Sequence, residues 1–240
     1  MKLPIFCVQC ATDKKQKTNQ MTMVDIRDDG LYQTVCENNH VNIVALQQQK
    51  FEILFDIGAY AILDGYYREA VSSFTTCIER FYEYYIKVIS LKHEISEEVF
   101  LKSWKIVSKQ SERQLGAFIY LFTIEKKCAP TLLSNSNIEF RNAVIHKGKI
   151  PEEKDAIKYG NDVLKIVRPI LYDLKMNYTK YVDKTIIQYL EAIKQKTPDK
   201  KNPNVMFIST VLSIAKREAH WDKMSLENFL VEMQKNRKQF

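Results

Sequence analysis

The sequence predicts a mainly α-helical protein with a small β module at its N-terminus. Only six glycines and six prolines occur among 240 residues, which favours long and uninterrupted elements. From about residue 47 onward, apolar residues recur at spacings of three and four, the period of a helix that buries one face. Before that point, short apolar runs are separated by an Asp-Gly turn signal, which is typical of β-strands.

Composition and charge narrow the function classes. Hydrophobic residues make up 45% and charged residues 27% of the chain, as in globular proteins. No run approaches the roughly 18 apolar residues of a membrane span, and the first residues are too short for a signal peptide before the polar Gln9 and Asp13. We therefore expect a cytoplasmic protein without a membrane partner. The net charge of +7 favours an anionic partner such as nucleic acid, although an ordinary basic protein explains it equally well.

Three cysteines and a histidine near the N-terminus have the spacing of metal ligands. Cys7 and Cys10 form a C-x-x-C pair, and Cys36 and His40 form a C-x-x-x-H pair. Three thiolates and one imidazole complete the tetrahedral shell of a structural zinc ion, and four protein ligands leave no position for a substrate. An odd cysteine count without a secretory signal argues against a disulfide framework. We expect structural zinc at these residues; the alternative is a set of reduced cysteines with His40 exposed.

The residues between the two pairs predict a zinc-ribbon-like module over residues 1–46. The expected strands are residues 21–26, 31–35 and 41–46. Asp29-Gly30 is a hairpin signal, so we expect the first two strands to form a hairpin that returns the second ligand pair to the first. A module this small requires an additional cross-link, such as a bound metal ion, to fold stably. It binds nucleic acid or protein, or serves as an inert support, and the sequence leaves these roles open.

The rest of the chain predicts helices, grouped into a bundle at residues 47–178 and a C-terminal extension at residues 179–240. Each segment combines a helical apolar period with polar or proline-containing breaks. Ser136, followed three residues later by Glu139, has the pattern of a capping box and predicts a helix that starts just before Phe140. The expected helices are residues 48–63, 64–91 or 67–91, 97–108, 112–126, 139–147, 152–178, 181–196, 205–220 and 224–236.

The run from Arg141 through Asn142 to His146 is the one segment that indicates a chemistry. Asn142 and His146 are four residues apart and share a helix face, while Arg141 lies one position off that face. A guanidinium can hold a phosphate through two hydrogen bonds and absorb developing negative charge. An imidazole can move protons near neutral pH. These are the side chains that metal-independent RNA cleavage requires, although an isolated Arg and His at this spacing have a structural role by default.

The context of this run resembles a known family. Residues 140–151, followed by a helix, resemble the R-x(4–6)-H motif of the HEPN superfamily (higher eukaryote and prokaryote nucleotide-binding), in which a polar residue such as Asn142 commonly follows the arginine. The upstream segment 65–81, with Glu79 at a typical acidic position, also resembles an early helix of the family. The resemblance covers about residues 48–178 and implies an HEPN-like helical bundle, often dimeric, with the two motifs facing each other across a two-fold axis.

The resemblance also implies an activity, because catalytic members of the family are metal-independent endoribonucleases. Arg141, Asn142 and His146 carry over as the catalytic residues. His146 is expected to remove the proton of a ribose 2′-OH, Arg141 to stabilise the phosphorane, and Asn142 to orient the imidazole or the phosphate. The expected products carry a 2′,3′-cyclic phosphate and a 5′-OH. Lys147 and Lys149 are candidates for binding flanking phosphates, with solvated surface lysines as the alternative.

The implied partners are RNA, with tRNA as one candidate, a second copy of the chain and a regulatory protein, in a toxin or antiviral defence role. Two alternatives stay open. One is a non-catalytic HEPN-like adaptor that binds nucleic acid, nucleotide or protein; the other is a zinc-ribbon interaction protein whose helices only dimerise, which predicts a buried and paired His146. No Gly-rich phosphate loop, paired carboxylate motif or H-E-x-x-H pattern supports nucleotide hydrolysis or metalloprotease chemistry.

Overall fold

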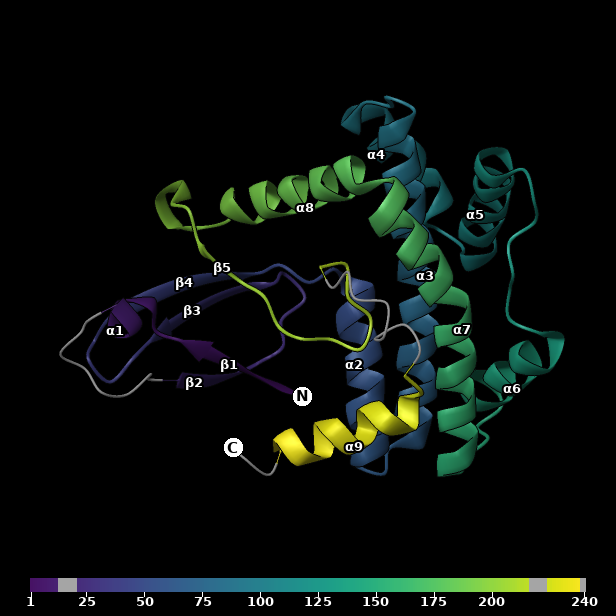
Figure 1. The fold of residues 1–240 in the computed structure, drawn as a ribbon, viewed down its shortest axis with the longest axis horizontal. Coiled ribbons are helices and arrows are strands. Elements are labelled where there is room, and N and C mark those ends of the chain that lie inside the picture. Colours follow the sequence, from purple (N-terminus) through teal and green to yellow (C-terminus); the bar gives the residue numbers. More distant parts are fainter. Residues whose placement is uncertain (13–20, 216–223, 238–240) are drawn as a thin grey trace. The chain divides into compact units, whose positions relative to one another are not determined.

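The computed structural model describes residues 1–12, 21–215 and 224–237, and it is mainly helical with a small N-terminal β region, as predicted (Figure 1). The chain forms two compact units. The first contains Met1–Gln48 and Lys184–Ser209, and the second contains Gln49–Asp183 and Thr210–Phe240. Among the described helices, none is both long and apolar enough to cross a membrane.

Short strands and one short helix build the first unit. Its elements are β1 (Lys2–Phe6), α1 (Val8–Thr12), β2 (Met21–Asp25), β3 (Leu31–Val35), β4 (Val41–Leu46), the end of α8 (Thr179–Lys194), the 3₁₀ helix η1 (Pro198–Lys200) and β5 (Asn204–Met206). β1 and β2 form an antiparallel pair, and β3 and β4 form another, which β5 extends by pairing parallel to β4. Cys7 and Cys10 therefore lie just after β1, and Cys36 and His40 lie between β3 and β4.

The predicted pairing of residues 21–26 with residues 31–35 is wrong. β2 pairs with β1, which was not among the expected strands, and the alternation of β1 buries Leu3 and Ile5, both 1% exposed. The Asp-Gly signal does form a turn, because Gly30 has a positive φ of 62° and its N–H donates to the Arg27 carbonyl at 3.3 Å. This turn connects the two sheets instead of closing a hairpin.

Helices build the second unit around the long helix α3. The helices are α2 (Lys50–Leu63), α3 (Tyr67–Lys92), α4 (Glu97–Val107), α5 (Ser111–Lys126), α6 (Asn135–His146), α7 (Glu153–Asn177), the start of α8, and α9 (Leu226–Arg237). α3 packs against α2, α5, α6 and α7, and its apolar residues Phe74, Phe81 and Tyr85 are fully buried (Figure 1). The predicted apolar stripe of this helix is therefore the centre of the bundle core.

The predicted helix at residues 205–220 is wrong over its described part. β5 ends at Met206, and the following chain is non-helical up to residue 215. Buried carboxylates of α2 hold this segment: Val211 N–H donates to Asp56 Oδ1 and Ile214 N–H donates to Glu52 Oε1, each at 2.9 Å. These long-range partners take the place of the hydrogen bonds of a helix, and no local pattern predicts them. Residues 216–220 lie outside the described residues.

The structure also groups the C-terminal third differently from the prediction. The predicted boundary at residue 46 lies two residues from the division after Gln48. The predicted extension at residues 179–240 is shared between the units, because Lys184–Ser209 belongs to the first and Thr210 onward to the second. The parallel pairing of β5 with β4 places part of this segment in the N-terminal sheet.

Gly58 and Gly160 lie where the core is packed too closely for a larger side chain. A Cβ built on Gly58 of α2 lies 2.5 Å from Phe74 Cε1, and one built on Gly160 of α7 lies 2.5 Å from Leu226 Cδ2 and 2.9 Å from Phe74 Cε2. We expect Gly58→Ala and Gly160→Ala each to lower the free energy of unfolding by about 1–3 kcal/mol, since overpacking displaces a buried ring. Urea unfolding followed by far-UV circular dichroism measures this.

Gly116→Ala in α5 is the matched control, because nothing lies within 4 Å of the position that its new methyl group would take. It adds the same methyl group to a helix without a clash, so we expect stability to rise by about 0.5–1 kcal/mol. Destabilisation of similar size in all three variants would contradict the close packing of the two glycines against Phe74.

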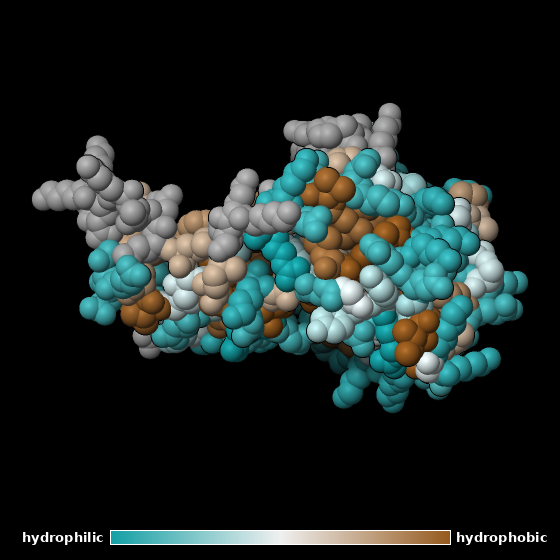
Figure 2. All heavy atoms as spheres, turned by 90° about the horizontal axis from the view of Figure 1, so that it is seen from below, coloured by the Kyte–Doolittle hydropathy of each residue, from teal (hydrophilic) through white to brown (hydrophobic). Residues whose placement is uncertain are grey.

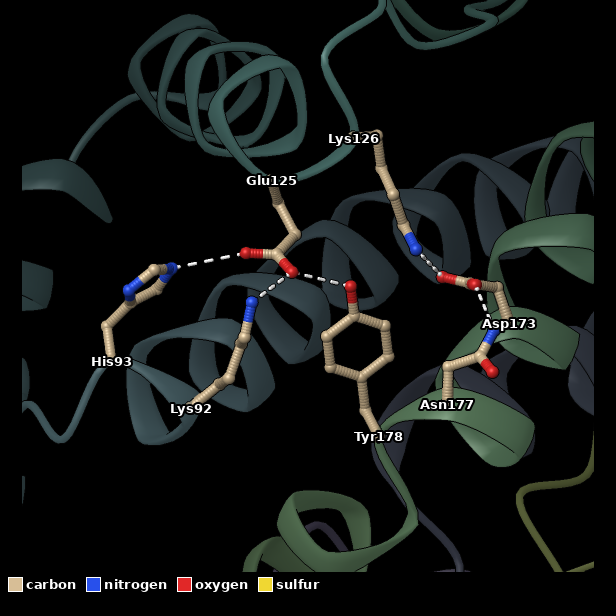
Figure 3. A network of polar contacts seen from close by, with 7 residues as sticks. All are labelled: Lys92, His93, Glu125, Lys126, Asp173, Asn177 and Tyr178. Atoms are coloured by element: carbon tan, nitrogen blue, oxygen red, sulfur yellow. Dashed lines mark hydrogen bonds and ion pairs between the residues drawn. The ribbon is translucent and has the colours of Figure 1, made fainter.

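A polar network joins the C-terminal ends of α3, α5 and α7 (Figure 3). Glu125 of α5 is its centre and accepts hydrogen bonds from Lys92, from Tyr178 Oη at 2.6 Å, and from His93 Nε2 at 3.2 Å. Lys126 forms an ion pair with Asp173 of α7, and its Nζ lies 4.7 Å from the centroid of the Tyr178 ring. The network closes this end of the bundle with paired charges.

This network predicts a loss of stability in acid. Burial by itself raises the pKa of Glu125, but the hydrogen bonds from Lys92, Tyr178 and His93 lower it from the ordinary 4.5 to about 2. Because the folded-state pKa is depressed, the stabilisation is present above about pH 4.5 and is lost as the pH falls toward 2. We expect Glu125→Gln to cost about 2–3 kcal/mol at pH 7 and to flatten this acid limb of the unfolding curve. An unchanged slope between pH 4.5 and 2 would contradict this.

Candidate functional site

The four predicted metal ligands lie together in the first unit. Cys7 directly follows β1, Cys10 lies in α1, and Cys36 and His40 flank the turn between β3 and β4. Their sulfur atoms and the His40 Nδ1 atom all lie within 4.8 Å of one another, and none of the five cysteines forms a disulfide. These four residues could hold a metal ion, as their spacing in the sequence predicts.

The distances fit a tetrahedral ion. Cys10 Sγ lies 3.6 Å from Cys36 Sγ and 3.3 Å from His40 Nδ1, and Cys7 Sγ lies 3.7 Å from His40 Nδ1. Around zinc, tetrahedral bonds of about 2.3 Å to sulfur and 2.0 Å to nitrogen give ligand separations of about 3.5–3.8 Å. The three cysteines are 2–7% exposed. A site so closed to solvent suits a structural ion.

The surroundings of the cluster favour a thiolate at Cys7 but disfavour a second thiolate at Cys10. Burial raises the pKa of the Cys7 thiol, but hydrogen bonds, first that from the Cys10 N–H, lower it to about 6. A hydrogen bond from Asn38 lowers the pKa of Cys10, but burial and the neighbouring sulfurs of Cys7 and Cys36 raise it to about 11. A divalent cation removes this conflict, because it stabilises all three thiolates together.

The Arg-Asn-x-x-x-His run lies in the second half of α6. The Ser134 hydroxyl accepts a hydrogen bond from the Asn137 N–H at 3.3 Å and caps the helix, so α6 begins at Asn135 and not at the predicted capping box of Ser136 and Glu139. Ser134 is also a good capping residue, and the choice between two such serines depends on the geometry of the preceding loop. The motif therefore ends α6 at His146 instead of starting it.

One face of α6 packs against α3 and α7. Val144 is fully buried, Asn137 Nδ2 donates to Asp162 Oδ2 at 3.2 Å, and the Phe140 ring lies 5.8 Å from the Tyr159 ring between centroids. These side chains recur at three- and four-residue spacing and fix the rotation of the helix about its axis. The orientation of the motif residues follows from that rotation.

Arg141 is half-buried at the edge of this packed face. Burial raises the pKa of the Glu79 carboxyl on α3, and the positive charge of Arg141, after that of Arg80, opposes the rise. Burial likewise raises the pKa of Tyr159 against the influence of Arg141. The Arg141 Nε atom is buried without a hydrogen-bond partner in the described part of the chain. The side chain of Arg141 thus lies partly against the bundle, with its Nε atom closed to solvent.

Asn142 and His146 lie on the opposite side of α6. Each is two positions from the buried Val144, about 200° around the helix, and His146 is exposed while Asn142 is half-buried. Within the described residues, neither side chain has a hydrogen bond to an orienting group. Arg141 and His146 are about 140° apart around the helix. One copy of the chain therefore presents an accessible imidazole and a held guanidinium on different sides of one helix.

The two candidate phosphate-binding lysines differ in their contacts. Lys147 and Lys149 are both exposed, but Lys149 Nζ lies 5.0 Å from the centroid of the Phe140 ring, within range of a cation–π interaction. Lys147 has no such contact among the described residues. Phe140 was not among the residues predicted for the site, although an aromatic residue directly before Arg141 was the available signal.

The remaining histidines do not extend this site. His93 belongs to the polar network around Glu125, and His220 lies outside the described residues. The exposure of His146 also contradicts the third alternative, which predicted a buried and paired imidazole.

The described residues expose both hydrophilic and hydrophobic side chains. Hydrophilic side chains cover most of the face shown in Figure 2, and hydrophobic ones gather in separate patches. The most exposed large apolar side chain of the described residues is Ile150, at 84%, four residues after His146.

A cavity of about 530 Å³ lies in the first unit, apart from the metal ligands. Its walls combine apolar side chains with charged ones from β2, β3, β4 and the segment before η1. The lining residues are Val24, Asp25, Arg27, Leu31, Tyr32, Gln33, Ile43, Lys196 and Pro198. No sequence pattern indicates this cavity, because Lys196 and Pro198 are distant from the other lining residues along the chain.

Comparison of the chain with protein-family models, with curated proteins and with solved structures found no match. Its function is therefore inferred from the residues and contacts of this chain, together with the motif resemblance.

Proposed function

We propose that this protein is a metal-independent endoribonuclease of the HEPN type. It cleaves RNA by attack of a ribose 2′-OH, leaving a 2′,3′-cyclic phosphate and a 5′-OH end. The observation that carries the proposal is the presentation of the motif by α6, with a half-buried Arg141 and an exposed His146 on different sides of the same helix. A guanidinium held in place costs little reorganisation when charge develops on a phosphate, and an exposed imidazole can reach a substrate.

The proposed reaction follows from in-line displacement at phosphorus. His146 takes the proton of the 2′-OH as the 2′-oxygen bonds to phosphorus. The bond from phosphorus to the 5′-oxygen breaks, and the departing 5′-oxygen receives a proton from a second His146 or from water. Arg141 stabilises the additional negative charge of the phosphorane, and Asn142 orients the imidazole or the phosphate.

A second copy of the chain completes the proposed site. Arg141 and His146 of one copy lie on different sides of α6, so they do not reach the same phosphate. A second copy is needed to place its Arg141 opposite the His146 of the first. A two-fold axis beside the exposed face of α6 brings the His146 of one copy toward the Arg141 of its partner. The exposed Ile150 offers apolar contact area next to this axis. The proposed unit of activity is therefore a homodimer.

Zinc is the metal we propose for the cysteine and histidine site. Thiolate and imidazole ligands at tetrahedral separation are the preference of Zn²⁺, and four protein ligands leave no open position. The ion stabilises the first unit and takes no part in the cleavage step. RNA positioning by this unit is an extension of the same proposal.

An adaptor without catalysis is the second candidate, and one observation favours it. Catalytic histidines are usually oriented by a hydrogen-bonded partner, and His146 has none within the described part of this chain. In the proposed dimer the partner copy supplies that group. In the adaptor the same face binds nucleic acid, nucleotide or protein without cleaving it.

Cleavage in the presence of EDTA separates the two candidates. Purified protein is incubated with total RNA and with a tRNA pool, and the product ends are determined. The nuclease is expected to cut without added metal. The 5′-OH ends of its products should accept a phosphate from a polynucleotide kinase, and the 2′,3′-cyclic phosphate ends should resist ligation. Binding of RNA without any cleavage would favour the adaptor, and 5′-phosphate products would contradict the proposed chemistry.

A further inference from the structure

We infer that Phe140 is a positioning residue for Lys149, and that Lys149 binds an RNA phosphate next to the one that is cleaved. This inference deepens the proposed function and rests on RNA as the substrate. Its starting point is the contact between Lys149 Nζ and the Phe140 ring, 5.0 Å from ammonium to ring centroid. A lysine over a ring is confined in its rotamers, whereas a solvated lysine is not.

The backbone turns Lys149 back toward α6. Gly148 has a φ of 71°, a conformation that favours glycine, and it lies two residues after His146, the last residue of the helix. The Lys149 N–H then donates to the Ala143 carbonyl at 3.0 Å. Lys147 precedes this reversal and its side chain has no ring beneath it in the described part of the chain. The fold therefore distinguishes two lysines that the sequence presents as equivalent.

The Phe140 ring is itself held from below by a buried stack. Tyr159 of α7 is 1% exposed and packs against Phe140, with ring centroids 5.8 Å apart. Its Oη lies 3.0 Å from the Thr75 Oγ1 of α3. Because the Thr75 hydroxyl donates to the Val71 carbonyl at 2.8 Å, the Tyr159 hydroxyl is the donor to Thr75. Tyr159 and Thr75 therefore fix the Phe140 ring, and this ring in turn restricts the ammonium group of Lys149.

The position of Lys149 relative to the motif suits a strand of RNA. Around the axis of α6, Arg141 lies on one side of the exposed His146 and Phe140 lies on the other. Lys149, above Phe140, therefore provides a second cation on the far side of the imidazole from Arg141. A strand whose scissile phosphate lies at His146, opposite the Arg141 of the partner copy, continues along this side of α6 toward Lys149. A lysine already confined loses less rotamer freedom when it binds the phosphate.

The test is binding of a fluorescently labelled single-stranded RNA, measured by anisotropy at several KCl concentrations in the cleavage-deficient His146→Ala protein. We expect Lys149→Gln to weaken binding about 3- to 10-fold and to reduce the slope of log K against log salt by about 0.7. Lys147→Gln is the matched control, because it removes the same charge two residues away. Equal effects of the two substitutions would overturn the inference, since they would indicate general electrostatic attraction.

Phe140 is tested by a double-mutant cycle. We expect Phe140→Leu to weaken binding about 2- to 5-fold when Lys149 is present and to have no further effect in the Lys149→Gln protein. Phe140→Tyr keeps a ring and is expected to bind like the parent, which controls for changes in folding. Additive effects of Phe140→Leu and Lys149→Gln would overturn the positioning role, as would an absence of RNA binding by every variant.

Failure of this inference and failure of the proposed function are distinguishable. If the parent protein with His146 does not cleave RNA but the binding cycle behaves as expected, the phosphate contact stands and the nuclease does not. If the protein cleaves RNA and the cycle shows no coupling between Phe140 and Lys149, the nuclease stands and the positioning role is overturned.

Discussion

Replacing His146 with alanine is expected to lower the rate of RNA cleavage by about 10²- to 10⁴-fold, the usual contribution of a general acid–base residue. His146 is exposed at the end of α6, so the substitution removes the proton carrier without opening a cavity. Thermal stability should therefore stay within about 0.5 kcal/mol of the parent protein. Initial rates on one labelled RNA in EDTA, with melting curves beside them, give both quantities.

His93→Ala is the control for this result. His93 is also exposed and also lies at the C-terminal end of a helix, but it belongs to the polar network around Glu125. The His93→Ala protein is expected to cleave RNA at the rate of the parent protein. Cleavage by His146→Ala at an undiminished rate would contradict the role of this imidazole and would point to another site or to a contaminating nuclease.

Replacing Cys36 with serine is expected to abolish binding of the metal and to unfold the N-terminal hairpins. Structural zinc sites in small modules contribute about 10–16 kcal/mol of apparent binding free energy, and that energy is folding energy. The first unit has only short strands for its core, so it depends on the ion. Metal analysis of the purified protein should give about one zinc per parent chain and none per variant chain. In the Cys36→Ser protein, the backbone amides of β3 and β4 should lose their protection against hydrogen exchange.

Cys128→Ser is the matched control for the metal site. Cys128 is exposed and lies outside the cluster of ligands, so this variant should keep the metal and its protection. Cobalt substitution adds a spectroscopic test, because tetrahedral thiolate ligands produce characteristic visible absorption. A Cys36→Ser protein that keeps both its metal and its protected strands would contradict the assignment of Cys36 as a ligand.

The cluster of Cys7, Cys10, Cys36 and His40 was predictable because each of its two pairs spans only a few residues and has the spacing of metal ligands. The pairing of the strands was not predictable in the same way. Residues 21–26 and 31–35 flank a valid turn signal, yet β1 offers β2 a partner across a longer connection. Local turn chemistry cannot weigh such competing long-range pairs.

The helical bundle was predictable for the opposite reason, since its apolar period extends over long segments. The failure at residues 205–215 has a clear cause. The buried carboxylates of Asp56 and Glu52 take the amides of Val211 and Ile214, more than 150 positions away in the chain. These distant hydrogen-bond partners override the local helical period on which the prediction rested.

The motif residues were identified from the sequence, but their arrangement was not. Spacing alone does not say that Arg141 lies at the packed edge of α6 while His146 is exposed. That distinction depends on the cap at Ser134 and on the packing of Val144 and Phe140. The divergence of Arg141 and His146 around the helix is also what makes a second copy necessary in the proposed mechanism.

The measurement that tests the proposed dimeric nuclease most directly is cleavage by a mixture of two inactive variants. Arg141→Ala and His146→Ala are assayed separately and after mixing under conditions that allow exchange of subunits, in EDTA, with the product ends determined. We expect neither variant to cleave alone. The mixture should regain roughly a quarter of the parent rate, since half of the dimers are mixed and each of these keeps one complete site. The products should carry 2′,3′-cyclic phosphates. Equal cleavage by the parent protein and by each single variant would contradict the proposed site.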